Sequence, residues 1–169
     1  MLYVLLKRCA GLCFNLLNAL LGGMLPPFAS ACLIVEEDGR YLVVELPGKR
    51  IVFPGGFMKW RETPQQAAAR EGLEETGLAL QVGELLNVYS GYSRNWLGLS
   101  AICLAFRGKV VSGQVLTELR ASIEGRPCWM SEEELLARLS GFSRVVFTDY
   151  QRQRAQHWTE APRVVSITP

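Results

Sequence analysis

Three glutamates, Glu71, Glu74 and Glu75, lie close together in one short stretch of the chain. Spacings of three and four residues place side chains on the same side of an α-helix, where like charges repel. These carboxylates also lie toward the C-terminal end of the expected helix, where the helix dipole is negative. A hard divalent cation relieves such repulsion, because it binds carboxylate oxygens together with the oxygens of a phosphate. The pattern favours metal-assisted phosphate chemistry, and a solvated acidic face with an Arg70–Glu74 ion pair is the simpler alternative.

The helix that must position these glutamates has clear signals at both ends. Thr63 suits the N-cap, Pro64 suits the first helical position, and Gln66 completes a capping box with Thr63. Gly77 suits the left-handed residue that closes a helix, and the alanines between the two ends favour helix. The sequence therefore predicts a helix from about Pro64 to Thr76.

The stretch from Gly56 to Leu78 resembles the Nudix box, G-x5-E-x7-R-E-U-x-E-E-x-G-U, where U is a bulky aliphatic residue. The residues that match at the required spacing are Gly56, Glu62, Arg70, Glu71, Glu74, Glu75, Gly77 and Leu78. One position departs from the motif, because Gly72 stands where the family usually has a bulky aliphatic residue. We interpret Gly72 as a packing defect and expect Gly72→Leu or Gly72→Val to be tolerated or slightly stabilising.

What the resemblance implies is hydrolysis of a pyrophosphate bond in a nucleoside diphosphate linked to another moiety, by attack of water at phosphorus. Mg²⁺ is the implied cofactor, with Mn²⁺ as the alternative, because a metal ion neutralises the phosphates and lowers the pKa of the attacking water. The implied metal ligands are three carboxylates and a backbone carbonyl: Glu71, Glu74, Glu75, and Gly56 or Gly55. Glu62 and Arg70 are expected to pair and hold the loop against the helix.

The general base and the substrate contacts are less defined. Glu71 and Glu124 are equal candidates for the base, and Glu118 is the next candidate. Expected substrate contacts are Gly55, Tyr92 and Arg94, since an aromatic ring can stack on a nucleobase and arginine binds phosphate. ADP-ribose, nucleotide sugars and nucleoside triphosphates are the substrate classes that the resemblance leaves open.

Two other functions are weighed against hydrolysis of a small nucleotide. A nucleotide sensor with this fold would bind without turnover, but sensors usually lack some box carboxylates, and none is missing here. Hydrolysis of RNA or dinucleotide caps is allowed by Arg152 and Arg154. A net charge of +2 does not favour nucleic acid as a partner.

The resemblance implies a fold of the α+β or α/β class, an α/β/α sandwich around a mixed β-sheet. Apolar runs bounded by turn residues predict strands over 28–35, 40–46, 50–53, 80–82, 85–93, 99–106 and 127–130. Ser131 and Glu134 form a second capping box, which predicts a helix to about Leu139. A last helix is expected from Thr148 to Trp158. We divide the chain into an N-terminal helix (1–27), a Nudix hydrolase domain (28–160) and a loose tail (161–169).

The N-terminal segment is apolar and is not explained by the resemblance. Its uncharged run, Cys9 to Leu25, follows Lys7-Arg8 as in a signal or anchor, but it is at the short limit for a membrane span. Helical spacing places one stripe of apolar residues on a single face: Leu2, Leu5, Leu6, Cys9, Leu12, Cys13, Leu16, Leu17, Leu20, Leu21 and Met24. Three interpretations stay open: a helix packed on the domain or on a second subunit, an interfacial membrane helix, and an anchor.

Cysteine usage bears on the compartment. Five cysteines, an odd number, are scattered through apolar segments without metal-ligand spacing to the single histidine. This pattern is typical of reduced cysteines in a cytosolic protein and disfavours zinc. We therefore expect a cytoplasmic location. The alternative is a cytoplasmic protein that associates with the membrane through its N-terminal helix.

Overall fold

The structure is a computed structural model that describes residues 12–92, 100–115, 125–155 and 164–167. Its helices are an N-terminal helix over residues 12–20, α2 (Pro64–Thr76), α3 (Glu132–Arg138) and α4 (Gly141–Ala155). Its strands are β1 (Phe28–Glu37), β2 (Arg40–Glu45), β3 (Ile51–Val52), β4 (Gly55–Phe57), β5 (Leu78–Tyr92), β6 (Ser100–Gly113), β7 (Arg126–Ser131) and β8 (Val164–Ile167).

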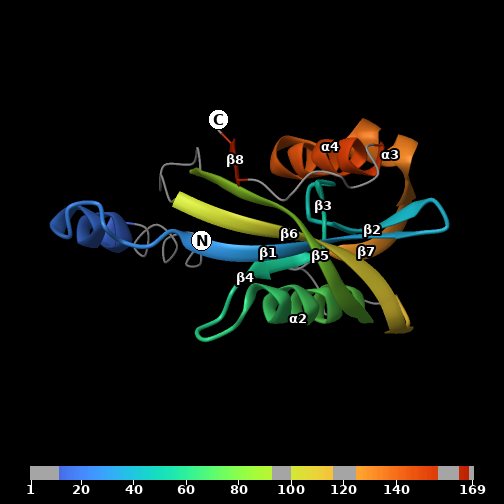
Figure 1. Ribbon diagram of the computed structural model, residues 1–169, viewed down its shortest axis with the longest axis horizontal. Coiled ribbons are helices and arrows are strands. Elements are labelled where there is room, and N and C mark those ends of the chain that lie inside the picture. The colour runs from blue at the N-terminus through green and yellow to red at the C-terminus, as the bar shows by residue number, and fades with distance from the viewer. Residues whose placement is uncertain (1–11, 93–99, 116–124, 156–163, 168–169) are drawn as a thin grey trace.

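The sheet is mixed, with the order β3-β2-β1-β6-β5-β8, and β4 pairs with β1 while β7 pairs with β2. The β1–β6 and β5–β8 pairs are parallel, and the other pairs are antiparallel. Figure 1 shows α2 on one side of the sheet and α3 and α4 on the other. The expected α/β/α sandwich with a mixed sheet is therefore confirmed.

Two apolar clusters fill the space between the sheet and the helices on its two sides. Because successive side chains of a strand point to opposite faces, Leu33 of β1 belongs to the cluster with Ala67 and Ala68 of α2. The next residue, Ile34, belongs to the cluster with Phe147 and Tyr150 of α4. The sandwich is thus held by burial of both faces of the central strand.

The ends of α2 are those that the sequence predicts. The Thr63 hydroxyl accepts a hydrogen bond from the Gln66 N–H, and the Gln66 side chain accepts one from the Thr63 N–H. Gly77 closes the helix at φ 76° in the left-handed region, which glycine adopts at little cost. These ends fix the register of the glutamates relative to the sheet.

Gly72 corrects the expectation of a packing defect. It lies in the buried stripe of α2, where an added Cβ would be 2.7 Å from Leu80 Cδ1 and 3.3 Å from Leu33 Cδ1. These two leucines occupy the space that a bulky aliphatic side chain would need. The glycine is therefore a close contact, and Gly72→Leu or Gly72→Val would be tolerated only if these leucine side chains move. We now predict that either substitution overpacks the contact between α2 and the sheet.

Three elements differ from the sequence-based expectation. The two segments expected before residue 94 form one strand, β5, whose pairing with β6 shifts register between Val82 and Leu85. Helix α4 begins at Gly141 instead of Thr148, because Val146 and Phe147 join its buried face despite modest helix propensity. Residues 164–167 of the expected loose tail pair with β5 as strand β8.

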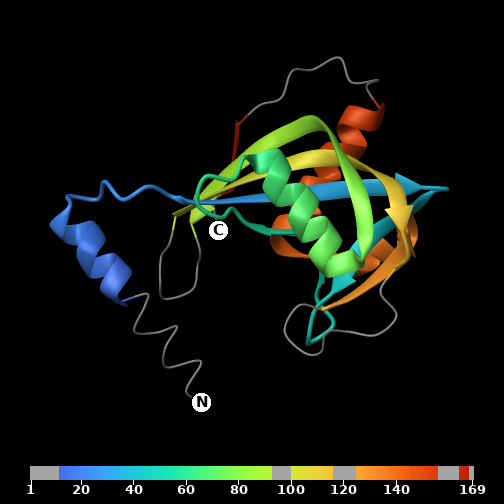
Figure 2. The same ribbon diagram turned by 90° about the horizontal axis from the view of Figure 1, so that it is seen from below.

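The N-terminal helix extends away from the sandwich (Figures 1 and 2). Its contact with the domain includes the Phe14 and Phe28 rings, whose centroids are 4.9 Å apart. Leu16, Leu20 and Met24 are 64%, 75% and 81% exposed, so packing of this stripe on the domain is excluded for the described residues. No helix within the described ranges is both long enough and apolar enough to cross a membrane.

Candidate active site

The carboxylates of α2 meet the sheet at β4. This short strand runs antiparallel to β1, with Gly55 opposite Cys32 and Gly56 opposite Ala31. The Gly55 N–H donates a hydrogen bond of 2.9 Å to Glu75 Oε2. An added Cβ on Gly56 would lie 2.6 Å from the Glu71 carboxyl carbon. Glu71 can approach this backbone so closely only because residue 56 is a glycine.

Arg70 joins the loop before α2 to the glutamates of the helix. Its Nε and Nη2 donate to the two oxygens of Glu62, at 2.7 and 2.9 Å. Its Nη1 donates to Glu71 at 2.7 Å and to Glu74 at 3.1 Å, and Nη2 also donates to the Phe57 carbonyl at 3.0 Å. The expected Glu62–Arg70 pair is therefore present, and it is bidentate, the strong geometry for this pair.

The charges of this cluster shift the pKa values of two partners. Hydrogen bonds from Arg70 and from the Lys59 N–H lower the pKa of Glu62 to about 2. The pKa of Arg70 is raised further, first by its hydrogen bond to Glu62 and then, against the effect of burial, by Glu71 and Glu74. The Arg70 and Glu62 side chains are 18% and 12% exposed, so water screens their contact only partly.

The donor set at β4 and α2 fits a hard divalent cation. Glu71 and Glu75 both reach the Gly55–Gly56 backbone, whereas Glu74 is half exposed and pairs with Arg70 and Lys59. Among the residues that the structure describes, no group of three or more carboxylate, imidazole or thiol side chains is placed to hold a metal ion by itself. Mg²⁺ is usually held by one or two carboxylates together with water and substrate phosphates.

A pocket of about 410 Å³ lies beside these glutamates. Its lining includes one carboxylate of α2, Glu75, together with the β4 residues Gly55 and Gly56. Arg50 adds a positive charge to the lining. Other lining residues come from β1, β6 and the start of α4 and are mostly apolar or small: Ser30, Ala31, Cys32, Cys103, Phe142 and Ser143. The sequence did not identify this group, because it comes from distant segments that carry no shared motif.

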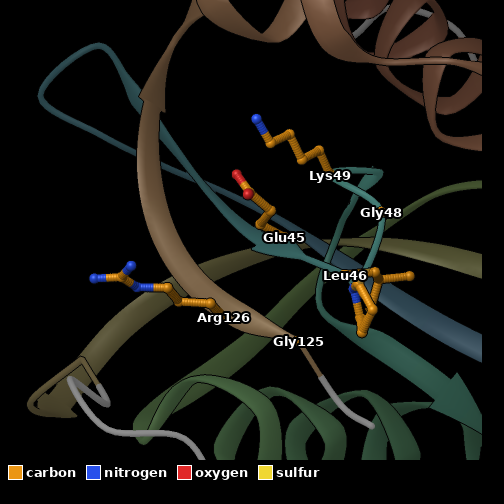
Figure 3. A pocket seen from close by; sticks show the side chains of 7 residues that line it. Glu45, Leu46, Gly48, Lys49, Gly125 and Arg126 are labelled. Atoms are coloured by element: carbon orange, nitrogen blue, oxygen red, sulfur yellow. The ribbon is translucent and has the colours of Figure 1, made fainter. Parts of the chain in front are cut away.

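A second pocket, of about 270 Å³, lies at the turn between β2 and β3 (Figure 3). Glu45, Lys49 and Arg126 line it, and the side chain of Arg126 extends away from those of Glu45 and Lys49. Arg138 Nη2 donates to Glu45 Oε2 at 2.7 Å. This pocket includes no residue of α2, whereas Glu75 of α2 lines the larger pocket.

Several residues proposed from the sequence cannot be placed. Arg94, Glu118 and Glu124 lie outside the described residues, and for Tyr92 only the backbone is described. Tyr89, on the same strand as Tyr92, is buried in the core, and its hydroxyl lies 3.3 Å from Asp149 Oδ2. The structure thus brings together the box residues and leaves the loop candidates for base and substrate contact as proposals.

An α/β/α sandwich with carboxylates of one helix beside a pocket is an arrangement that suits the binding of a metal ion together with a phosphate group. The family model described as the NUDIX domain matches residues 25–150, more than half of the chain. The chain therefore belongs to the Nudix hydrolase family, whose enzymes act on pyrophosphate bonds.

Similar proteins support this assignment. The chain is 33% identical over 119 residues to a MutT-like protein of Streptomyces ambofaciens, covering 68% of this chain and 72% of that protein. It is 31% identical over 123 residues to an ADP-ribose pyrophosphatase of Methanocaldococcus jannaschii, covering 70% of each. A NUDIX hydrolase structure from Nitrosomonas europaea aligns with a TM-score of 0.66 at 27% identity, covering 75% of this chain and 90% of that one.

Proposed function

We propose that this enzyme hydrolyses, with Mg²⁺ or Mn²⁺, a pyrophosphate bond in a nucleoside diphosphate linked to another moiety. ADP-ribose, nucleotide sugars and nucleoside triphosphates are the substrate classes to be compared. One observation carries the proposal: Glu71 and Glu75 both reach the Gly55–Gly56 backbone at the side of the 410 Å³ pocket. The two relatives, named as MutT-like and as an ADP-ribose pyrophosphatase, agree with these classes.

The residues of the site have distinct proposed roles. Glu71, Glu75 and the Gly56 carbonyl hold the metal ion, with Glu74 binding directly or through water. When bound, the ion supplies neutralisation of the phosphates and a lower pKa for the attacking water. Arg70 and Glu62 keep the loop against α2, since their bidentate contact joins residues on both segments. This arrangement fixes Glu71 before substrate arrives, which is what preorganised catalysis requires.

The general base stays assigned to Glu71 or Glu124, with Glu118 as the next candidate. Substrate contacts are proposed for Gly55, which lines the pocket, for Tyr92, the last residue of β5, and for Arg94, which follows it in the sequence. Arg50 joins this set, because its cation lies in the lining of the same pocket, where a phosphate group would be attracted.

Arg152 and Arg154, the two residues that would favour an RNA substrate, each form an ion pair with a carboxylate. Arg154 Nη1 lies 2.8 Å from Glu36 Oε1, and Arg152 Nη1 lies 3.6 Å from Asp149 Oδ1. A cation that pairs with a carboxylate is less available to a phosphate backbone. This favours a small nucleotide over RNA. We infer a cytoplasmic location, where such nucleotides are found.

Glu75→Gln tests the proposal, because it removes a ligand charge while it preserves the shape of the side chain. A panel of nucleoside diphosphate derivatives is incubated with Mg²⁺ or Mn²⁺, and the products are identified by mass. We expect turnover of at least one substrate class by the wild type and a kcat lower by several orders of magnitude in Glu75→Gln.

Glu84→Gln is the matched control, because Glu84 is an exposed glutamate on β5. It should keep the wild-type rate, and both variants should melt like the wild type. A Glu75→Gln protein that melts normally and turns over substrate at nearly the wild-type rate would overturn the site assignment. Calorimetric binding without turnover by the wild type would favour the sensor instead.

A further inference from the structure

Two of the side chains in the lining of the larger pocket are thiols, and they lie in contact with each other. Cys32 comes from β1 and Cys103 from β6, and their sulfur atoms are 3.8 Å apart. Cys32 is 7% exposed, whereas Cys103 is partly exposed. The pocket therefore presents Cys103 as the accessible thiol of a pair in the lining of the proposed substrate site.

The surroundings of Cys103 favour its reactive form. Reactivity of cysteine follows the thiolate and its exposure. The hydrogen bond with Cys32 lowers the pKa of Cys103, which burial would otherwise raise, and a hydrogen bond with Ser30 lowers it further. The hydrogen bond with Cys103 and burial raise the pKa of Cys32. Cys128, which lines neither pocket, has a pKa raised first by burial.

We propose that Cys103 is a modification site in the wall of the substrate pocket, where hydrogen peroxide converts its thiolate to a sulfenic acid and weakens substrate binding. The sulfur attacks one peroxide oxygen, so an S–O bond forms and the O–O bond breaks. The leaving hydroxide takes a proton and departs as water. Sulfur is oxidised and the peroxide is reduced. The effect on binding rests on the proposed function, whereas the modification itself does not.

The strand register favours the sulfenic acid over a disulfide with Cys32. Cys32 is opposite Ala105, and Cys103 is opposite Ser30, so the two cysteines are offset by two positions along parallel strands. An offset of about 6.6 Å along strands about 4.8 Å apart places the Cα atoms roughly 8 Å apart. A disulfide requires less than about 7 Å without backbone movement. We therefore expect the oxidised protein to keep a modified Cys103 beside a reduced Cys32.

Weaker binding has a steric and an electrostatic cause. The added oxygen occupies part of the pocket that Phe142 and Ala31 also line, and it places a polar group among these apolar side chains. The carboxylates of α2 are not altered. KM should therefore rise several-fold while kcat changes little.

The experiment treats the full-length protein with hydrogen peroxide and follows both mass and kinetics. Digestion and mass spectrometry should find one added oxygen on the peptide that contains Cys103, before any change at Cys128. KM for the best substrate of the panel should rise several-fold, and a thiol reductant should restore it. Cys103→Ser and Cys103→Ala, each compared with its own untreated sample, should not respond. The matched control Cys128→Ser should respond like the wild type.

Two results would overturn the inference, and they can be told apart. If the Cys103 peptide stays unmodified while Cys128 reacts, the thiol is not a modification site. If Cys103 carries the oxygen but KM is unchanged, the pocket beside Cys103 is not where substrate binds. Turnover before treatment is measured in the same samples, so a failure of the proposed hydrolase function is seen separately.

Discussion

At the scale of single residues, Arg70 organises the site through its complete set of N–H donors. Its guanidinium donates to three carboxylates and to a backbone carbonyl, which uses all the N–H groups that the side chain carries. Only arginine presents donors in such a planar fork, so lysine could replace the charge but not the contacts. Glu62 is the partner that anchors this fork to the loop.

A pH dependence of stability follows from Glu62. Its pKa is lowered from 4.5 to about 2 in the folded protein, so the unfolded state binds a proton first as the pH falls. The stabilisation from its ionised form is present above the unfolded pKa and is lost as the pH falls through about 2. Chemical denaturation in chelator-treated buffer measures the free energy of unfolding of the wild type and of Glu62→Gln. The difference between these two free energies should be constant above about pH 5 and should shrink below it.

The matched control is Glu84→Gln, since the exposed Glu84 lies outside the cluster. The free energy of unfolding of Glu84→Gln should differ from that of the wild type by an amount that does not change in this way over the same pH range. A difference for Glu62→Gln that is the same at pH 7 and at pH 3 would mean that the contact with Arg70 does not hold the carboxylate ionised.

At the scale of elements, helix α2 begins and ends at residues that the sequence predicts, and it packs on the sheet through small side chains. Its buried stripe consists of Ala67, Ala68, Gly72 and Thr76, and the larger side chains come from the sheet, where Leu33 and Leu80 fill the contact. Small residues let the helix backbone approach the sheet closely. The position of Glu71 over Gly56 depends on this approach, because both lie at the same contact of α2 with β4.

Gly72→Leu tests the packing of α2. The new side chain would meet Leu80 and Leu33, so we expect a loss of about 1–3 kcal/mol in the free energy of unfolding from overpacking. Gly72→Ala should be close to neutral, because about 1 kcal/mol of helix propensity offsets the displacement of a leucine tip. Urea denaturation of the two variants and the wild type measures both values.

A compensating change supplies the control. Leu80→Ala in the Gly72→Leu background removes the nearest obstructing side chain and should recover part of the loss. Gly72→Leu with wild-type stability would show that the contact is loose enough to accept the side chain that the Nudix box usually has.

At the scale of the whole molecule, the N-terminal helix is the part that the Nudix domain does not explain. The family match begins at residue 25, and the apolar stripe of the helix is exposed over residues 12–24. Exposed apolar surface of this kind marks an interaction site. A second copy of the chain and an anionic membrane surface, attracted by Lys7 and Arg8, are two partners that would bury this stripe. A membrane anchor stays the third interpretation, since residues 1–11 lie outside the described residues.

Deletion of residues 1–25 should leave a folded and active domain. We expect its melting temperature and kcat to stay near those of the full chain, because the helix adds few contacts to the sandwich. Its sedimentation should change relative to the full chain, either in association state or in recovery with anionic liposomes. Sedimentation of both proteins, alone and with anionic or neutral liposomes, distinguishes self-association from membrane binding. An unfolded, inactive truncation would place the helix in the domain core.

The sequence alone determined the features that depend on neighbouring residues. The ends of α2, both capping boxes and the grouping of the box carboxylates follow from spacings of a few residues, which helix geometry converts directly into positions. The Glu62–Arg70 pair was implied by the resemblance to the Nudix box. The family and the sandwich followed from the same short motif.

Only the tertiary structure decided the features that join distant segments. Leu80 and Leu33 make Gly72 a close contact instead of a defect, and burial of Val146 and Phe147 moves the start of α4 to Gly141. Pairing with β5 makes a strand of residues 164–167. The parallel register of β1 and β6 places Cys103 beside Cys32 in the pocket lining. Such contacts are set by which surfaces meet after folding, and no local spacing encodes them.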